Sequence, residues 1–234
     1  MKKTILPLAL LLCCISMYAQ KGPSGKGLQF GLMYSMPKRT QFDTYMATIS
    51  HALGIDQTLI AKNDIGFAAG LSFRSGDTEV GVGGGIMLGH KTKINNTGGS
   101  VSATLNTTTF DIHFGFNKYL AGPFFIGSDF GVISSGGKFE TVGMESLFET
   151  SSSSSNPFIG YSLMVKPKAG FFFSFKKGEF TGLRLNAFYD LGLSKYEFYK
   201  NNLFSTRLKD YTGETKTSYS GFGVDAILVF SLDK

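Results

Sequence analysis

The chain has 234 residues, with 30 Gly, 23 Phe, 10 Tyr, 2 Cys and no Trp, and its formal net charge is +6 at pH 7. This length suits a single domain, and the small basic excess does not indicate binding to nucleic acid. Both cysteines lie within the first 20 residues, and no later segment is apolar for 18 residues, so disulfides and helical membrane spans are excluded from the mature chain.

The first element, residues 1–19, has the features of a secretory signal peptide. Lys2 and Lys3 precede an apolar stretch at residues 5–15, and the small residue Ala19 follows. A membrane anchor is the less favoured alternative, because a spanning helix needs about 20 apolar residues. We predict export with cleavage near Ala19, which leaves residues 20–234 as a single domain without cysteine.

Eight later segments alternate between apolar residues and polar or small residues with a period of two, as β-strands do. They lie at 28–34, 65–73, 80–88, 110–116, 124–132, 161–175, 182–194 and 222–230. Pro167 lies inside the sixth segment, but the alternation keeps its phase across it. We therefore predict one long strand with a local irregularity, and ten strands remain an alternative to eight.

The connections between these segments alternate in length. Tight turns are expected at 75–78, 120–123 and 176–179, and long loops at about 37–63, 91–105, 135–157 and 195–217. Short turns at one end and long loops at the other are typical of outer-membrane barrels. The pattern predicts an all-β fold, namely a closed antiparallel eight-stranded transmembrane β-barrel with an up-and-down meander.

The second face of the strands carries charged residues in balanced number, four basic and four acidic. Charges enclosed in a narrow lumen must be paired, whereas charges on a soluble sandwich need no such balance. We therefore expect the charged face inside and the apolar face against lipid. The predicted lumen charge network comprises Arg74, Asp111, His113, Asp129, Lys166, Lys168, Arg184, Asp190 and Asp225.

With these strands and turns, the mature chain resembles the small eight-stranded outer-membrane barrels of Gram-negative bacteria, the OmpA and OmpX type and the related outer membrane protein beta-barrel domain families. The resemblance implies an outer-membrane location and a closing strand whose terminal aromatic residue, here Phe230, is read by the barrel assembly machinery. The chain departs from this pattern by continuing for four residues to Lys234. The expected lipid-facing strand-end aromatics are Tyr34, Phe73, Phe124, Tyr161, Phe175 and Phe230.

Catalytic chemistry has little support in the sequence. His51, His90 and His113 are scattered, and their spacing does not suit a metal site. His113 follows Asp111 by two residues on the lumen face, so an internal polar network is favoured over a catalytic dyad. We predict no catalytic residue, no metal and no cofactor.

Two long loops have informative patterns. In the first, Phe42, Tyr45, Met46, Ile49 and Leu53 recur at helical spacing before Gly54, which predicts a short helix over the outer mouth, with a loop packed on the rim as the alternative. The fourth loop, at 195–216, mixes basic and aromatic residues that suit lipopolysaccharide phosphates or a surface ligand.

The favoured function is a non-enzymatic structural or surface-interaction role through the extracellular loops. The expected partners are outer-membrane lipid, lipopolysaccharide, the assembly machinery and an extracellular ligand, with no nucleic acid. The alternatives are a narrow pore or transport-associated channel and, less favoured, a lipid-modifying enzyme.

Overall fold

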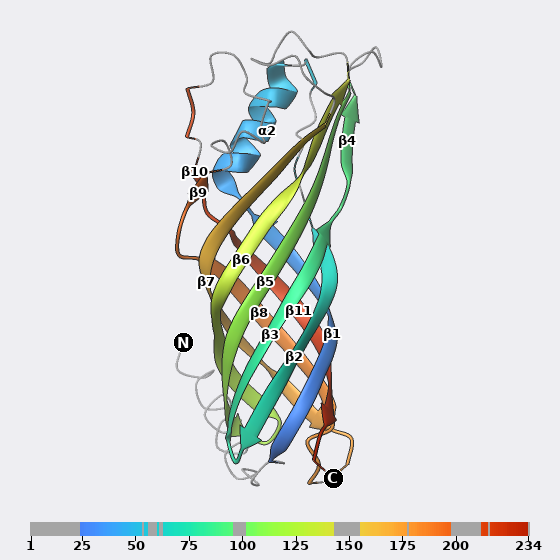
Figure 1. The fold of residues 1–234 in the computed structure, drawn as a ribbon, viewed down its shortest axis with the longest axis vertical. Coiled ribbons are helices and arrows are strands. Elements are labelled where there is room, and N and C mark those ends of the chain that lie inside the picture. The colour runs from blue at the N-terminus through green and yellow to red at the C-terminus, as the bar shows by residue number, and fades with distance from the viewer. Residues whose placement is uncertain are drawn as a thin grey trace, which may run out of the picture.

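Eight strands of the computed structural model close into one ring (Figure 1). The structure describes residues 24–52, 54–55, 60, 63–95, 102–142, 155–176, 178–197, 212–214 and 216–233. The ring strands are β1 (Gly25–Lys38), β2 (Asp64–Ser75), β3 (Thr78–Gly89), β5 (Ser102–Ala121), β6 (Phe124–Val142), β7 (Ser155–Ser174), β8 (Gly182–Gly192) and β11 (Ser220–Ser231). Each pairs with the next in antiparallel register, and β11 pairs with β1. The predicted closed eight-stranded meander is confirmed.

Three short strands lie outside the ring. β4 (Thr92–Asn95) pairs only with β5, while β9 (Tyr196–Glu197) and β10 (Lys216–Thr217) pair with each other. The predicted signal peptide and its cleavage site lie outside the described residues, as do residues 143–154 and 198–211 of two long loops.

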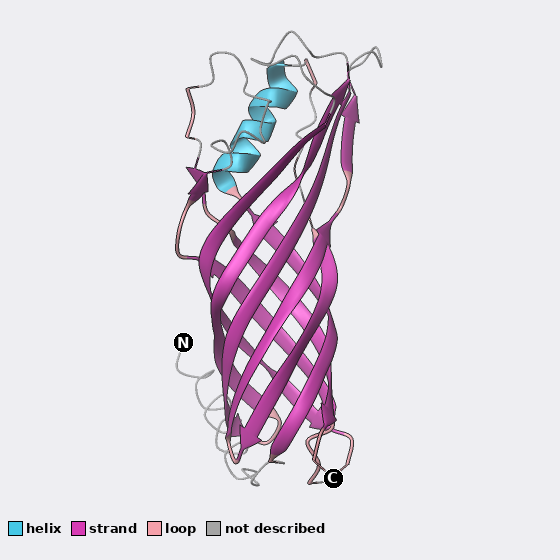
Figure 2. Cartoon of the chain, viewed as in Figure 1, coloured by secondary structure: helices cyan, strands magenta, loops and turns pink. Residues whose placement is uncertain are grey.

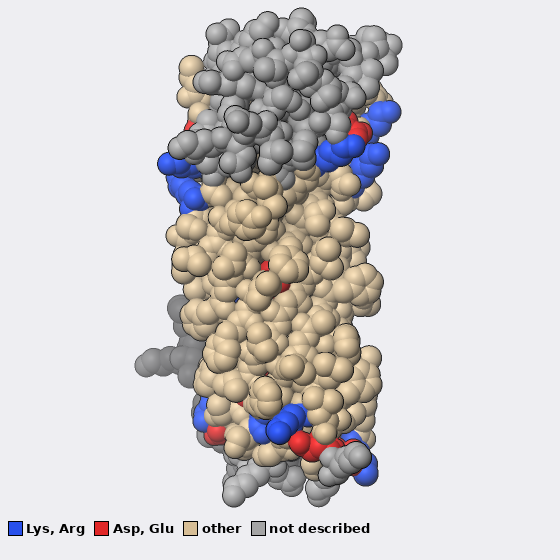
Figure 3. All heavy atoms as spheres, viewed as in Figure 1, with Lys and Arg blue, Asp and Glu red and all other residues tan. Residues whose placement is uncertain are grey.

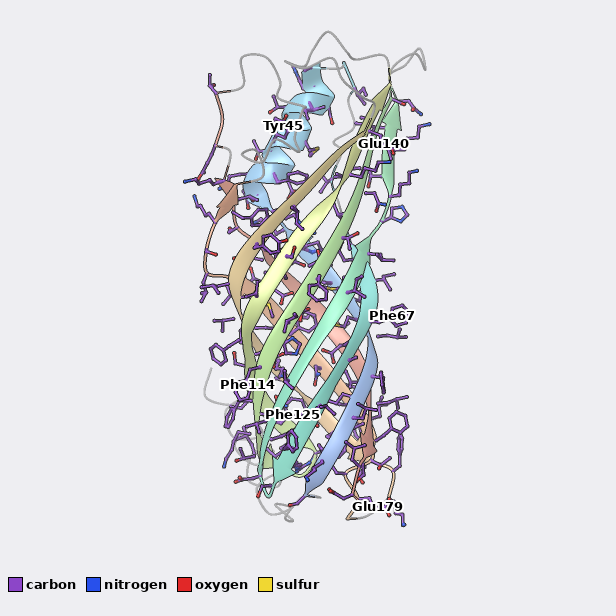
Figure 4. The ribbon with its side chains drawn as sticks, viewed as in Figure 1. Tyr45, Phe67, Phe114, Phe125, Glu140 and Glu179 are labelled. Atoms are coloured by element: carbon purple, nitrogen blue, oxygen red, sulfur yellow. The ribbon has the colours of Figure 1, made fainter. Side chains whose placement is uncertain are left out.

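The wall of the barrel is apolar on its outer surface. Side chains such as Phe67 and Phe114 point outward and are more than half exposed, whereas neighbouring positions on the same strands point into the lumen (Figure 4). On the face shown in Figure 3, charged side chains gather in two bands, and the surface between them is almost entirely uncharged. An exposed apolar band of this kind is stable only against hydrocarbon, so the barrel is a transmembrane one.

The three predicted tight turns lie at one end of the barrel, which we call the turn end. Each contains a glycine with a positive φ angle, at Gly76, Gly122 and Gly178, where a side chain would strain the backbone. The opposite end, which we call the loop end, carries the only described helix, α2 (Thr40–Ala52) (Figure 2). No helix in the described part of the chain is long and apolar enough to cross a membrane.

The helix predicted in the first long loop is confirmed. Phe42, Tyr45, Met46 and Ile49 form its buried face, and the fifth predicted position, residue 53, is not described. The chain leaves the helix at Gly54, whose φ angle is +62° and whose N–H donates to the carbonyl oxygen of His51.

The expected loops at 91–105 and 135–157 are shorter than predicted, because β5, β6 and β7 continue beyond the apolar belt and β4 joins them. In this extension the polarity of the two faces is reversed. Ala103 and Leu105 are buried on the inner face, while Asn106 and Lys138 are exposed on the outer one. Water replaces lipid outside the extension, so polar side chains face outward there.

The irregularity expected at Pro167 is present in a single continuous strand, β7. Pro167 pairs with Ser128 of β6, but the register between β7 and β8 passes from Val165 to Lys168 without a partner for the two residues between them. Proline has no N–H to donate, so the ladder is interrupted on one side only.

Candidate functional site

The structure places all nine residues of the predicted charge network on inward-facing positions of the strands. Lys166 lies at the centre of this network. Its Nζ is 3.5 Å from a carboxylate oxygen of Asp111 and 3.5 Å from one of Asp190, and 4.9 Å from the centre of the Phe188 ring. A lysine removed from water in this way is stabilised by two opposite charges and one aromatic face.

His113 connects two of the carboxylates. Its Nδ1 lies 2.5 Å from Asp111 Oδ1 and its Nε2 lies 3.8 Å from Asp129 Oδ2, and Asp129 also pairs with Lys168. The inner face of β3 provides the space for this ring, because a Cβ at Gly83 would come within 3.1 Å of His113 Nε2. His113 is therefore held within the internal network, as the sequence suggested.

Arg184 pairs with Glu79, a residue that the sequence reasoning missed. Arg184 Nη2 lies 2.5 Å from Glu79 Oε1, and the hydroxyl of Tyr119 donates to Glu79 Oε2 at 2.7 Å. Arg74 stacks on the same Tyr119 ring at 3.4 Å. Glu79 immediately precedes the apolar segment at 80–88, and extending that segment's period by one residue would have placed it on the lumen face.

The remaining predicted carboxylate, Asp225, accepts a hydrogen bond of 2.5 Å from the side-chain amide of Asn186. The predicted balance of four basic and four acidic groups is incomplete, since Glu79 and a second missed pair, Arg39 with Asp64, also lie inside. The described lumen carries the five basic groups Arg39, Arg74, Lys166, Lys168 and Arg184 and the six acidic groups Asp64, Glu79, Asp111, Asp129, Asp190 and Asp225.

Arg39 closes the lumen at the loop end. It lies between β1 and α2, is almost completely buried, and donates to Asp64 at 3.3 Å, to Thr109 at 3.1 Å and to Ser135 at 3.0 Å. Its guanidinium also lies 5.3 Å from the centre of the Tyr219 ring. One side chain therefore ties the start of α2 to strands β2, β5 and β6.

Asp43, in the first turn of α2, is buried beside Arg39 and Lys38. Its pKa is raised above the ordinary value, because loss of hydration disfavours the carboxylate more than these two cations stabilise it.

An apolar cluster closes the lumen at the turn end. Phe180, which follows the third tight turn, is buried in the barrel, and its ring lies 5.4 Å from that of Phe172. Tyr119 and Phe125 form a second ring pair at 5.2 Å. The complete cluster is Tyr119, Phe125, Phe172, Phe180, Ile227 and Val229.

A small polar chamber of about 50 Å³ remains between the two closures. Glu79, Asp129, Lys168 and Arg184 are among the residues that line it. Asn117 Oδ1, also in the lining, has no hydrogen-bond partner within the described protein. A polar cavity of this size has room for a few water molecules.

The predicted strand-end aromatics lie on the outer surface. Phe73, Tyr161, Phe175 and Phe230 are exposed, and Tyr34 and Phe124 are partly covered by neighbours. His51 is exposed on α2, and His90 follows β3 at the rim, where its backbone N–H donates to the carbonyl oxygen of Asn63. Within the residues that the structure describes, no group of three or more His, Cys, Asp or Glu side chains is arranged to hold a metal ion.

No family model matches the sequence, and no curated protein matches it either. Among solved structures, the chain is similar in shape to Ail, the attachment invasion locus protein of Yersinia pestis, determined with the heparin analogue sucrose octasulfate. The identity is 12%, the match covers 89% of this chain and 99% of Ail, and the TM-score is 0.45.

OprG from Pseudomonas aeruginosa matches at 10% identity over 90% of this chain and 99% of its own, with a TM-score of 0.43. The TodX monoaromatic hydrocarbon channel, in a deltaS2S3 mutant, matches at 6% identity over 90% and 91%, with a TM-score of 0.32. The fold follows from the strand pairing of this chain itself: a closed meander of eight antiparallel strands with an apolar outer wall, which is the architecture of the small eight-stranded outer-membrane barrels.

Proposed function

We propose that this protein is a non-enzymatic outer-membrane barrel that acts through the surface it presents at the loop end, in a structural or surface-interaction role. The observation that carries the proposal is the closure of the lumen at both ends, by Arg39 and α2 at one end and by the cluster around Phe180 at the other. In a barrel closed in this way, partners can reach the outer wall and the loop end, whereas solutes have no open passage through the lumen.

The loop end has features suited to an anionic partner. Lys91 immediately precedes β4, Lys93 lies within β4, and Lys138 lies on the outward side of β6. All three side chains are exposed just beyond the apolar belt. Glu140, an acidic neighbour, pairs with Lys138 at 2.7 Å. Cations at the level of lipid headgroups attract phosphate. Lipopolysaccharide is the partner that this position favours, and an extracellular ligand bound by the loops is the alternative.

Placement in the outer membrane rests on the apolar belt and on the export signal predicted at residues 1–19. By analogy with other barrels, the turn end faces the periplasm and the loop end faces outward. Phe230, exposed on the closing strand, is the residue that we assign to recognition by the assembly machinery.

Membrane fractionation followed by gel electrophoresis of unheated and heated samples tests this placement. A folded barrel migrates differently before and after boiling, so we expect two positions for the outer-membrane fraction. Identical migration, or recovery from the periplasm, would reject the proposal. Incubation of the folded protein with lipid A and with phospholipid tests the absence of enzymatic activity, and release of fatty acid would contradict it.

A narrow pore is the second candidate, because the chamber between the closures is lined by charged side chains. Measurements in planar bilayers distinguish the two roles. We expect small and rare openings at most, since an eight-stranded barrel is filled by its own side chains. Steady conductance of porin size would favour the channel instead.

A further inference from the structure

A group of charged residues lies on the outer face of the strand extension, just beyond the apolar belt. In this sector the belt ends at Leu88 on β3 and Ile159 on β7, which are exposed and are joined in one row by successive register partners on β5 and β6. Gly136 belongs to this row, and Lys138 lies two residues beyond it on the same face of β6, about 7 Å along the strand. The polar headgroup region is about 5–7 Å thick on each side of the hydrocarbon, so Lys138 lies at the level of lipid headgroups.

This group, which we call the loop-end cation site, consists of Lys91, Lys93, Lys138 and Glu140. Lys93 of β4 and Glu140 of β6 lie in one row, because both pair with Thr104 of β5. Lys138 Nζ lies 2.7 Å from Glu140 Oε1, and Figure 4 shows Glu140 near the loop end of β6. The site therefore carries three positive charges and one negative charge, which leaves a surplus of +2.

Two of the lysines act on the same carboxylate. The pKa of Glu140 is lowered below its ordinary value, first by the hydrogen bond from Lys138 and further by the charges of Lys138 and Lys91. Within the part of the chain that the structure describes, neither Lys91 nor Lys93 forms an ion pair of its own. Glu140 therefore pairs with one lysine and leaves two ammonium groups available to another anion.

The turn end carries a matched pair without such a surplus. Lys118 Nζ lies 2.7 Å from Asp77 Oδ2, and both side chains are exposed, as are those of Lys138 and Glu140. Hydrogen bonds from Lys118 and then from Thr78 lower the pKa of Asp77, and no second lysine contributes. The comparison shows that the excess of lysine around an exposed ion pair belongs, among the described residues, to the loop end.

We propose that the loop-end cation site binds a phosphate group of lipopolysaccharide, and that Glu140 is an internal anion that occupies the site until the phosphate displaces it. This step rests on the proposed function, in which the loop end faces outward among lipopolysaccharide. A phosphate monoester carries a charge of about −1.5 to −2 and has three acceptor oxygens, so it can bind all three lysines at once. The surplus of +2 balances this charge, so no divalent cation is required between the phosphate and the protein.

Binding of lipid A to the folded barrel in detergent with EDTA tests the site, and native mass spectrometry counts the bound lipid. Glu140→Gln removes the competing carboxylate and should tighten binding by about two- to fivefold, the range expected of an exposed ion pair. Lys93→Gln should weaken binding by about fivefold, the contribution of one lysine near an anionic headgroup. Asp77→Asn and Lys118→Gln, which change the matched pair at the turn end, should leave binding unchanged.

Several results would overturn the proposal. Weaker binding by Glu140→Gln that Mg²⁺ restores would make this carboxylate a ligand of a bridging cation. Equal effects of Glu140→Gln and Asp77→Asn would mean nonspecific attraction of charge. Equal binding of lipid A that lacks its phosphates would exclude phosphate as the ligand, and displacement of lipid A by an equal concentration of inorganic phosphate would make a free anion the ligand.

These results are separable from failure of the proposed function. A normal heat-dependent gel shift in each variant shows that the barrel is folded, so the variant results above refute the loop-end cation site alone. A parent protein that binds no lipid A at all would refute both this site and lipopolysaccharide as the partner.

Discussion

Replacement of Arg184 by Ala would leave Glu79 as a buried carboxylate without its closest cation. The two side chains are 2% and 1% exposed, and their atoms lie 2.5 Å apart. At an effective dielectric constant of 20 the attraction between them is about 6–7 kcal/mol, from which the cost of desolvating both groups must be subtracted. Removal of one member of such a pair typically costs about 3–5 kcal/mol. Arg74 lies close enough to offset part of this loss, so the lower half of the range is expected.

The free energy of unfolding can be measured by urea titration in lipid vesicles. The chain contains no Trp, so circular dichroism or the heat-dependent gel shift must replace tryptophan fluorescence as the signal. The double variant Arg184→Met with Glu79→Gln removes both charges and should recover most of the loss.

The pair Lys176–Glu179 provides a matched control, with the same 2.5 Å separation but with side chains that are 75% and 47% exposed. Lys176→Ala should not shift the midpoint measurably, because water screens the pair. An indifferent Arg184→Ala, or equal effects of Arg184→Ala and Lys176→Ala, would refute the inference that burial sets the strength of the lumen pairs.

Further expectations concern the two closures. Phe180→Ala should lower the free energy of unfolding by about 3–5 kcal/mol, because it opens a cavity in the turn-end cluster, and a change below about 1 kcal/mol by urea titration would contradict the closure. Arg39→Ala should release α2, so limited proteolysis of intact cells should cut within residues 40–52 faster than in the parent protein. Burial raises the pKa of Asp43, so its carboxyl group binds a proton more tightly when α2 is folded than in the unfolded chain. The stability that this protonation contributes is lost as the pH rises through the raised pKa. Resistance of α2 to protease should therefore fall as the pH rises just above 3.8, the ordinary pKa of an aspartate, and Asp43→Asn should remove this pH dependence. An unchanged pH profile in the variant would show that the Asp43 carboxyl does not cause it.

The fold could be predicted largely from periodicity, because lipid imposes one simple rule on the outer wall. Every outward position within the belt must be apolar or small, so a period of two extends over each strand. The same rule fails for the strand extensions. Beyond the belt Leu105 faces inward and Lys138 faces outward, which is the reverse of the pattern within the belt. Because the predicted strands were defined by an apolar outward face, these residues were assigned to loops.

The candidate site was less accessible to sequence reasoning. The alternation along the strands predicts that Arg184 and Lys166 face inward. Which carboxylate each one pairs with depends on the register between strands and on the length of the side chains across the lumen, and the sequence pattern does not specify either. Glu79 was missed because its segment was read from Val80 onward. Arg39 and Phe180 lie between predicted strands, and nothing local to either residue indicates that it folds back into the barrel.

The reversed polarity of the extension also constrains the order in which the barrel assembles. If β4 and the hairpins of β5, β6 and β7 slid across the membrane fully formed, the exposed Lys93 of β4 and Lys138 of β6 would pass through hydrocarbon, at a cost of about 2–4 kcal/mol for each lysine near the midplane. If the extension crosses while the ring is still open, these side chains can remain in water throughout. The ring, which the pairing of β1 with β11 completes, must then stay open until the extension has crossed the membrane.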